Sequence, residues 1–290
     1  MADAQPLPEN LRQGALFAVG AAACFAGVGA CIKAASATLP NEMVVFLRNA
    51  VALLALLPWI LRVRLRGLAT QHLAGHLYRT GFGLAAMYCF FYALNHLQLA
   101  EAVLLNYSAP LFIPLIAWLW LREVPPLIIA PVTLLGFAGI VLILNPGAEG
   151  LLRWPALVGA VSGVLAAAAM VSIRRVARTE TTPRIVFYFS LLSTVISSIP
   201  LLWAWQTPLP FALGVMLIAG VLALLGQLCL TRAYSLAPAA RVGAITYISV
   251  VFAALVGWLV WNETPTMMAA GGAVLVITAC ILASWQLRRG

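Results

Sequence analysis

The stretch from Ala93 to Pro125 decides the fold because the chain contains it twice: ALNHLQLAEAVLLNYSAPLFIPLIAWLWLREVP. The segment from Ala233 to Pro265, 140 positions later, reads AYSLAPAARVGAITYISVVFAALVGWLVWNETP, and nine positions are identical without a gap. The identities include a tyrosine, a tryptophan and a closing Glu-x-Pro, which an apolar composition alone would not align at one offset. Self-similarity of this kind indicates an internal duplication.

The composition requires a lipid environment. Of the 290 residues, 63% are hydrophobic and 9% are charged, and the mean hydropathy is +1.02. No soluble domain could hide that much apolar surface from water. A helix that crosses the hydrocarbon core needs about 20 mostly apolar residues. Ten such stretches fit, and the predicted spans are Gly14–Lys33, Asn41–Ile60, Thr80–Leu97, Ala100–Leu121, Leu127–Leu144, Pro155–Val176, Arg184–Trp203, Phe211–Ser235, Ala240–Trp261 and Thr266–Gln286.

These spans predict an all-α integral membrane protein with two five-helix repeats, residues 14–144 and 155–287. The positive-inside rule gives the orientation. If the N-terminus is cytoplasmic, 14 of the 17 basic residues fall inside, and only Lys33, Arg48 and Arg153 fall on or near the outside. Both termini are therefore expected in the cytoplasm. The inside residues include those of a predicted basic loop: Arg62, Arg64, Arg66, His72, His76 and Arg79.

The odd number of spans in each repeat has a geometric consequence. A five-helix unit ends on the opposite side from where it begins, so the second copy inserts upside down relative to the first. Glu123 is then expected inside and its counterpart Glu263 outside. Inverted repeats are typical of secondary transporters, which hold their substrate near the midplane between the two halves.

Four features in these repeats carry a family resemblance: Arg48, Pro110, Glu123 and the repeated Glu263-x-Pro265. The pattern resembles the drug/metabolite transporter superfamily and, within it, the EamA group of ten-helix exporters, with YddG-like aromatic amino-acid exporters as a candidate subgroup. The resemblance implies export of amino acids and related metabolites across the bacterial inner membrane by alternating access. One departure is Val250, which replaces Pro110 in the second repeat, so the two copies are expected to bend differently.

Charged residues within the predicted spans are candidate gates or anchors, because charge is costly in the bilayer. Arg48 is a carboxylate anchor or gate charge in one interpretation, and a structural cation near the outer interface in the other. Lys33 ends its span and can extend to the interface. Glu101 suits the start of a helix, and could instead pair with Arg48 or Lys33 as an outer gate. Glu123 and Glu263 are interpreted as structural.

Several absences bound the mechanism. No Asp or Glu lies in the central third of any predicted span, whereas a proton-driven exporter of lipophilic cations needs a membrane-embedded acid. A facilitator, or exchange without a titrating carboxylate, is therefore expected. The five cysteines lie in apolar stretches at no metal-binding spacing. No metal, cofactor or catalytic residue is expected, and an enzyme acting on lipid-linked substrates is the least favoured alternative.

Polar and aromatic side chains recur at helical spacing within four predicted spans. Their aromatic faces and neutral hydrogen-bonding groups suit a zwitterion with an apolar or aromatic side chain. Pro110 lacks an amide hydrogen and frees a carbonyl one turn earlier, so a helix kink is expected there. Interface anchoring or helix packing is the alternative for each tyrosine. The predicted cavity lining is Tyr88, Tyr92, Asn95, Asn106, Tyr107, Ser108, Gln227, Thr231, Tyr234, Thr246 and Tyr247.

The predicted function is therefore a secondary transporter that exports amino acids, including aromatic ones, and related small metabolites. Other cargo, such as cationic drugs or nucleotide-sugars, is the nearer alternative. The arginines flank apolar spans and form no single patch, so the formal charge of +9 does not indicate a nucleic-acid partner. The expected partners are the substrate and the lipid bilayer of the bacterial inner membrane. A lone GxxxG at Gly159 and Gly163 is weak evidence for a dimer, and a monomer is expected.

Overall fold

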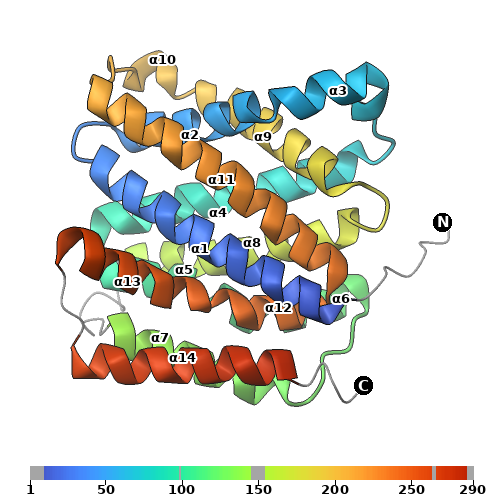
Figure 1. Ribbon diagram of the computed structural model, residues 1–290, viewed down its shortest axis with the longest axis vertical. Helices are drawn as coiled ribbons and strands as arrows, with labels where there is room; N and C mark the ends of the chain where they lie inside the picture. Colours follow the sequence, from blue (N-terminus) through green and yellow to red (C-terminus); the bar gives the residue numbers. More distant parts are fainter. Residues whose placement is uncertain (1–9, 98, 145–153, 263–265, 286–290) are drawn as a thin grey trace.

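The computed structural model describes residues 10–97, 99–144, 154–262 and 266–285, with the side chains of 64–66, 91, 94–95, 99–102 and 284–285 left out. Every regular element in this part is a helix, and the helices form one bundle (Figure 1). The first repeat contains α1 (Leu11–Ala35), α2 (Asn41–Ala55), α3 (Leu57–Leu68), α4 (Leu73–His96), α5 (Leu99–Asn106), α6 (Ala109–Leu121) and α7 (Ile129–Leu144).

The second repeat repeats this order with small differences. Five apolar helices, counting α5–α6 from Val103 and α12–α13 as single spans, are long enough to cross a membrane, and α2 with α3 makes a sixth, bent by 43°. With α4, α9 and the shorter apolar helices α7 and α14, ten membrane-crossing elements result. The helices of the second repeat are α8 (Trp154–Val176), α9 (Thr182–Ser198), α10 (Leu201–Ala204), α11 (Pro210–Leu236), α12 (Ala239–Thr246), α13 (Ile248–Trp261) and α14 (Met267–Trp285).

The predicted basic loop is wrong in two places. Its first part is helical, because the chain bends at Leu56 and continues as α3. Its last part belongs to α4, which begins at Leu73, seven residues before the predicted start. His76 and Arg79 are therefore helical and only 1% and 4% exposed. Only one face of the first turns of α4 is buried, the face with His76 and Arg79, whereas Leu73, Leu77 and Tyr78 are exposed.

The repeats are inverted, as the odd span count predicts. In Figure 1, α6 ends on the side where α1 begins and α14 ends, whereas α13 ends on the opposite side. Arg122 and Asn262, which are 140 positions apart, end these helices with the same left-handed backbone, at φ 57° and 54°. The main packing pairs are also equivalent, since α1 packs on α11 as α8 packs on α4.

The symmetric helices α7 and α14 approach each other most closely at glycine. A Cβ on Gly139 would lie 2.7 Å from the carbonyl oxygen of Gly272, and a Cβ on Gly272 would lie 2.5 Å from that of Gly139. Only residues without a side chain allow this backbone contact. The largest buried cluster likewise joins helices of both repeats, including α1, α6, α8, α11, α12 and α14.

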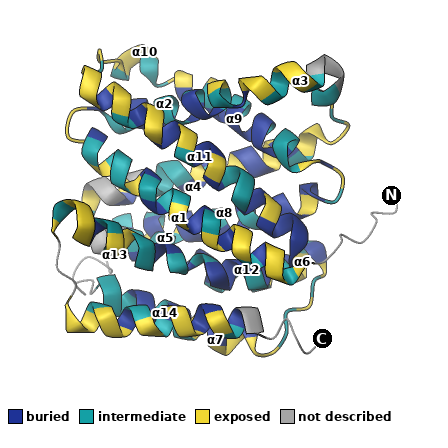
Figure 2. Ribbon diagram, viewed as in Figure 1, coloured by how far each residue is buried: buried dark blue, intermediate teal, exposed yellow. Residues whose placement is uncertain are grey.

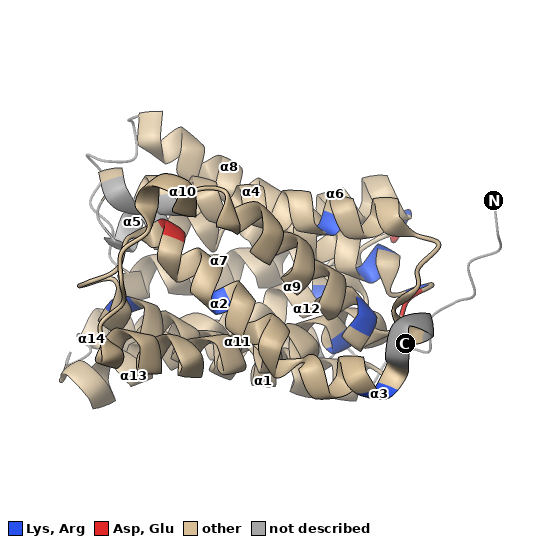
Figure 3. Cartoon of the chain, turned by 90° about the horizontal axis from the view of Figure 1, so that it is seen from above, with Lys and Arg blue, Asp and Glu red and all other residues tan. Residues whose placement is uncertain are grey.

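The outer surface of the bundle is apolar. Large side chains such as Leu16, Leu202 and Leu259 are 72%, 85% and 68% exposed, and exposed residues cover the outward faces of the helices (Figure 2). Lipid, and not water, is the solvent that suits such a surface. Most basic segments gather at the end of the bundle with α3 and the two termini (Figure 3).

We expect that end to face the cytoplasm. The measurement is labelling of intact cells with a membrane-impermeant maleimide, in a background whose five native cysteines are alanine. Gln71→Cys and Thr207→Cys are exposed positions in connections at opposite ends of the bundle. Thr207→Cys should react and Gln71→Cys should react only after permeabilisation. Reaction of Gln71→Cys in intact cells would reverse the orientation.

Candidate central transport site

Both copies of the duplicated stretch break in mid-span. The first breaks between Asn106 and Ala109, and the second at Tyr247, the counterpart of Tyr107. The second copy breaks although Val250 stands in place of Pro110. Broken helices inside a membrane are tolerated where their free backbone groups are satisfied or line a cavity.

Hydroxyl groups satisfy several carbonyls at the two breaks. Ser108 Oγ donates to the carbonyl of Leu105 at 2.6 Å, and Thr246 Oγ1 donates to that of Gly243 at 2.6 Å. The hydroxyls of Tyr107 and Ser249 are hydrogen-bonded at 3.0 Å and link one break to the other. The two repeats are therefore in direct hydrogen-bonded contact at their breaks.

A cavity of about 150 Å³ lies between these breaks. This volume is below the roughly 300 Å³ of the smaller pockets that hold drug-sized ligands, so it suits a small molecule. The polar lining comes from Asn106, Tyr107, Thr246 and Ser249. The apolar lining is Ala21, Ala22, Phe25, Ala109, Pro110, Ala166, Met170 and Leu230.

Three of the predicted lining residues, Asn106, Tyr107 and Thr246, meet at this cavity with the predicted kink residue Pro110 beside them. Asn106 Nδ2 also donates to Ser162 Oγ on α8 at 3.2 Å, which fixes its amide toward the opposite repeat. Ser108 is buried at the break itself.

The other predicted lining residues whose side chains are described do not line this cavity. Thr231, Tyr234 and Tyr247 are 1% exposed or less and pack in the core. Tyr92 is exposed and stacks on His96 with ring centroids 4.2 Å apart. The remaining residues are Tyr88, partly buried on α4, Gln227, which meets Arg79 instead, and Asn95, whose side chain lies outside the described residues.

Arg79 is a polar residue that the sequence did not indicate, as is Ser249 in the cavity lining. Its Nη2 donates to Gln227 Oε1 at 3.1 Å, and its Cζ lies 4.0 Å from the centroid of the Phe189 ring. Arg79 was expected outside the membrane because the predicted span begins at Thr80. Leu73 and Leu77, at helical spacing before Arg79, are the signal that could have extended the helix.

The predicted charge anchors have different positions. Arg48 lies at the midpoint of α2, because that helix ends at Ala55 and not at Ile60. Because α3 continues the same bent span, Arg48 lies in the first half of that span, and its depth in the membrane stays a prediction. Lys33 lies in the last turn of α1, with Nζ 4.5 Å from the ring centroid of Trp261. The side chain of Glu101 lies outside the described residues.

Glu123 ties the two repeats together at the end that carries both termini. Its carboxylate accepts from Arg174 Nε at 2.9 Å and lies 3.5 Å from Arg178 Nη2. It also accepts from the backbone N–H of Ala239, where α12 begins, at 3.3 Å. Arg174 in turn donates to the carbonyls of Tyr234 and Ser235 at the end of α11. This network connects α6 of the first repeat to three helices of the second.

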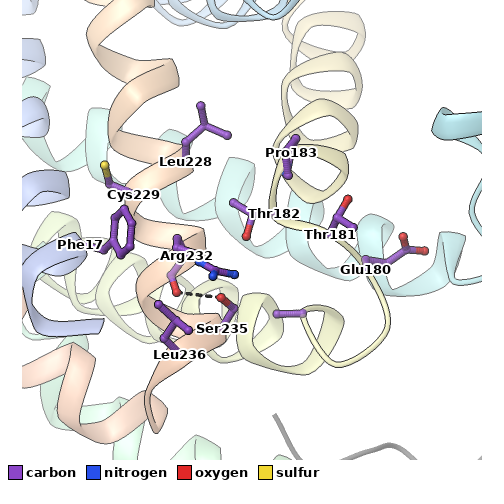
Figure 4. A pocket seen from close by; sticks show the side chains of 11 residues that line it. Phe17, Glu180, Thr181, Thr182, Pro183, Leu228, Cys229, Arg232, Ser235 and Leu236 are labelled. Atoms are coloured by element: carbon purple, nitrogen blue, oxygen red, sulfur yellow. Dashed lines mark hydrogen bonds between the residues drawn. The ribbon is translucent and has the colours of Figure 1, made fainter. Parts of the chain in front are cut away.

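A larger hollow of about 590 Å³ lies at the same end, between α1, α11 and the start of α9. Figure 4 shows Arg232 extending between α11 and the Thr181–Pro183 segment. Phe17 and Cys229 form the opposite wall. We call this hollow the vestibule.

The comparisons with known proteins agree with this architecture. The model of the EamA-like transporter family matches the chain twice, over residues 12–145 and 153–285. The chain belongs to the EamA-like transporter family. A solved structure titled only "Crystal structure of protein" superimposes with a TM-score of 0.83 at 19% identity, covering 95% of this chain and 98% of that one, which shows the shared fold.

Curated relatives of this EamA-like transporter are themselves transporters. It is 38% identical to the pseudopaline exporter CntI of Pseudomonas aeruginosa, over 94% of this chain and 96% of that protein. It is 27% identical to the riboflavin transporter of Vibrio cholerae, over 96% and 95% of the two chains. It is 26% identical to the S-adenosylmethionine uptake transporter of Rickettsia bellii, over 82% and 81%. The protein is therefore a multi-pass membrane protein of a family of transporters.

Glu123→Gln should destabilise the protein, because it removes the negative charge between two arginines, one of which is 4% exposed. Breaking such a partly buried pair costs about 2 kcal/mol, or about 5 °C in the melting temperature. Thermal unfolding of the detergent-purified protein measures it. Glu42→Gln is the matched control, since Glu42 has no ion pair within the described part. Equal melting temperatures for the two variants would contradict the role of Glu123.

Proposed function

We propose that this EamA-like transporter exports amino acids, aromatic ones included, and related small metabolites by alternating access. The observation that carries the proposal is the cavity at the two helix breaks, to which both repeats contribute neutral hydrogen-bonding groups. In a pair of inverted repeats, exchanging the conformations of the halves opens such a cavity to the other side. We place the protein in the bacterial inner membrane as a monomer, with both termini in the cytoplasm.

The lining supports a zwitterionic cargo. Asn106, Thr246 and Ser249 offer both donors and acceptors, while Phe25 and Tyr107 offer aromatic faces to an apolar side chain. The 38%-identical relative is named as an exporter, which supports the direction. Other relatives are named for riboflavin and S-adenosylmethionine, so the family fold alone does not select the cargo.

The Glu123 network supports a gate at the proposed cytoplasmic end. It joins the ends of α6, α8 and α11 to the start of α12. Two of these helices, α6 and α12, belong to the spans that break at the cavity. Separating these charges would let the halves part on that side. Lipophilic cations are a less suitable cargo, because the glutamates whose side chains are described, Glu42, Glu123 and Glu180, all lie at or beyond helix ends.

Tyr107→Ala should lower transport of the preferred amino acid by about tenfold or more, since losing about 1.5 kcal/mol of aromatic contact costs that factor. The measurement is the initial rate of uptake of labelled amino acids, tested singly, into proteoliposomes. Tyr78→Ala is the control, because Tyr78 is 57% exposed on α4 and stacks on Phe82 away from the cavity. Equal rates for wild type and Tyr107→Ala would reject the lining, and no uptake of any amino acid by wild type would reject the cargo.

Transport should not need a proton gradient, because no described carboxylate lies in the middle of a span. Counterflow of labelled amino acid should proceed at the same rate, within about twofold, with and without a pH difference of one unit across the liposome membrane. One unit corresponds to 1.36 kcal/mol per coupled proton, so obligatory coupling would change accumulation by about tenfold. Loss of transport without the gradient would overturn facilitated exchange.

A further inference from the structure

Two arginines inside the bundle lie on α2 and α4, and both of these helices pack against α9. Arg79 on α4 is 4% exposed, and Arg48 lies at the midpoint of α2 with its Nε buried. The two guanidinium groups are near enough to interact electrostatically. Arg79 donates to Gln227 Oε1 at 3.1 Å, and Arg48 Nη2 donates to Asn49 Oδ1 at 3.2 Å. Each guanidinium group thus donates a hydrogen bond to a neutral amide oxygen.

This arrangement is costly as it stands. A buried arginine at membrane depth costs about 2.5–3.5 kcal/mol or more, and two like charges side by side repel each other. Among the described residues, no carboxylate lies within 4.0 Å of either guanidinium. Glu123 and Glu180, which could neutralise them, are already paired with Arg174 and Arg184. The positive charge in this region has no anionic partner among the described side chains.

Unpaired polar atoms are frequent on the helices that carry or contact these arginines. The described part has nine buried side-chain nitrogen or oxygen atoms without a hydrogen-bond partner, and six of them, apart from the two ring nitrogens of His76, lie on α2, α4, α9 and α11. Buried polar groups are normally paired, so a group of orphans marks a place where a ligand or solvent belongs. Three of them are nitrogen donors: Arg48 Nε, Arg79 Nε and Asn49 Nδ2. The others are the hydroxyls of Thr80, Ser193 and Tyr234.

We propose that Arg48, Asn49 and Arg79 form a binding site for the carboxylate of the cargo. A carboxylate supplies one negative charge and about four acceptor positions, which match the three unpaired nitrogen donors and a neighbouring hydroxyl. The space is tightly packed, with Thr80 and Ser193 at most 1% exposed, which favours a flat carboxylate over a tetrahedral phosphate. Asn49 and Gln227 hold the two guanidinium forks in place before the ligand arrives.

The vestibule gives this site an approach from the proposed cytoplasmic end. Arg79 contacts Gln227 on α11 and Phe189 on α9, and the same two helices wall the vestibule through Leu228 and Pro183. Phe189 lies six residues beyond Pro183, or about 9 Å deeper along α9. An exported anion would therefore meet the arginines after entering the vestibule. The inference rests on the proposed function only in taking the carboxylate to be part of the cargo.

The experiment measures binding separately from transport. The full-length protein is purified in detergent, and its melting temperature is followed against sodium phenylacetate, neutral phenylacetamide and inorganic phosphate at constant ionic strength. A ligand that binds the folded state raises the melting temperature with concentration. Phenylacetate should stabilise the wild type in a saturable manner, and phenylacetamide and phosphate should not.

Arg79→Gln should weaken the apparent affinity for phenylacetate at least about tenfold, as expected for losing a hydrogen bond to a charged group. Arg62→Gln is the matched control, because it removes the same charge from an exposed residue of α3 and should bind as the wild type does. Arg79→Lys keeps the charge without the fork and should bind at an intermediate affinity. If Arg79→Gln does not fold, Arg48→Gln takes its place.

Three results would overturn the site. They are equal stabilisation of the wild type by phenylacetate and phenylacetamide, stabilisation by phosphate alone, and unchanged phenylacetate binding in the arginine variants. Failure of the proposed function has a different outcome. If proteoliposomes take up no amino acid while phenylacetate binding still depends on Arg79, the carboxylate site stands and only the amino-acid cargo falls.

Discussion

The constraint on which the structure depends is that lipid cannot hydrogen-bond a peptide group. Every span must therefore satisfy its own backbone, and a break is tolerated only where it is buried or lines a cavity. This chain breaks two spans at equivalent positions, beside Tyr107 and at Tyr247, and places a cavity between them. The hydroxyls of Ser108 and Thr246 take up carbonyls that the breaks expose. The position of the cavity thus follows from where the backbone could be interrupted.

Duplication makes this solution symmetric. Because each repeat has an odd number of spans, the copies insert in opposite senses, and the same contacts occur twice across the pseudo-twofold axis. Helices α7 and α14 touch through Gly139 and Gly272, which leave room for backbone contact. Helices α6 and α13 both end at a residue with a left-handed backbone, Arg122 and Asn262, as expected of duplicated segments.

The contacts made by charged residues differ between the two ends of the bundle. Glu123 gathers Arg174, Arg178 and the start of α12 at one end, while at the other end Lys33 lies over the ring of Trp261. The first end is held by a partly buried ion-pair network and the second by a cation over an aromatic ring. The two ends are therefore held by different interactions, although the backbone around them is nearly equivalent.

The sequence by itself determined the all-helical membrane fold, the inverted repeats and the convergence of Asn106, Tyr107 and Thr246, because hydropathy and a fixed offset are properties of the chain. It did not determine the start of α4, where His76 and Arg79 interrupt the apolar pattern, or the end of α2, which lies inside an apolar run just before Pro58. Only the tertiary structure placed Arg79 beside Gln227 and Arg48, and buried Tyr234 and Tyr247. The physical reason is that a side chain's surroundings depend on which other helices pack against it, and helical spacing alone carries no such information.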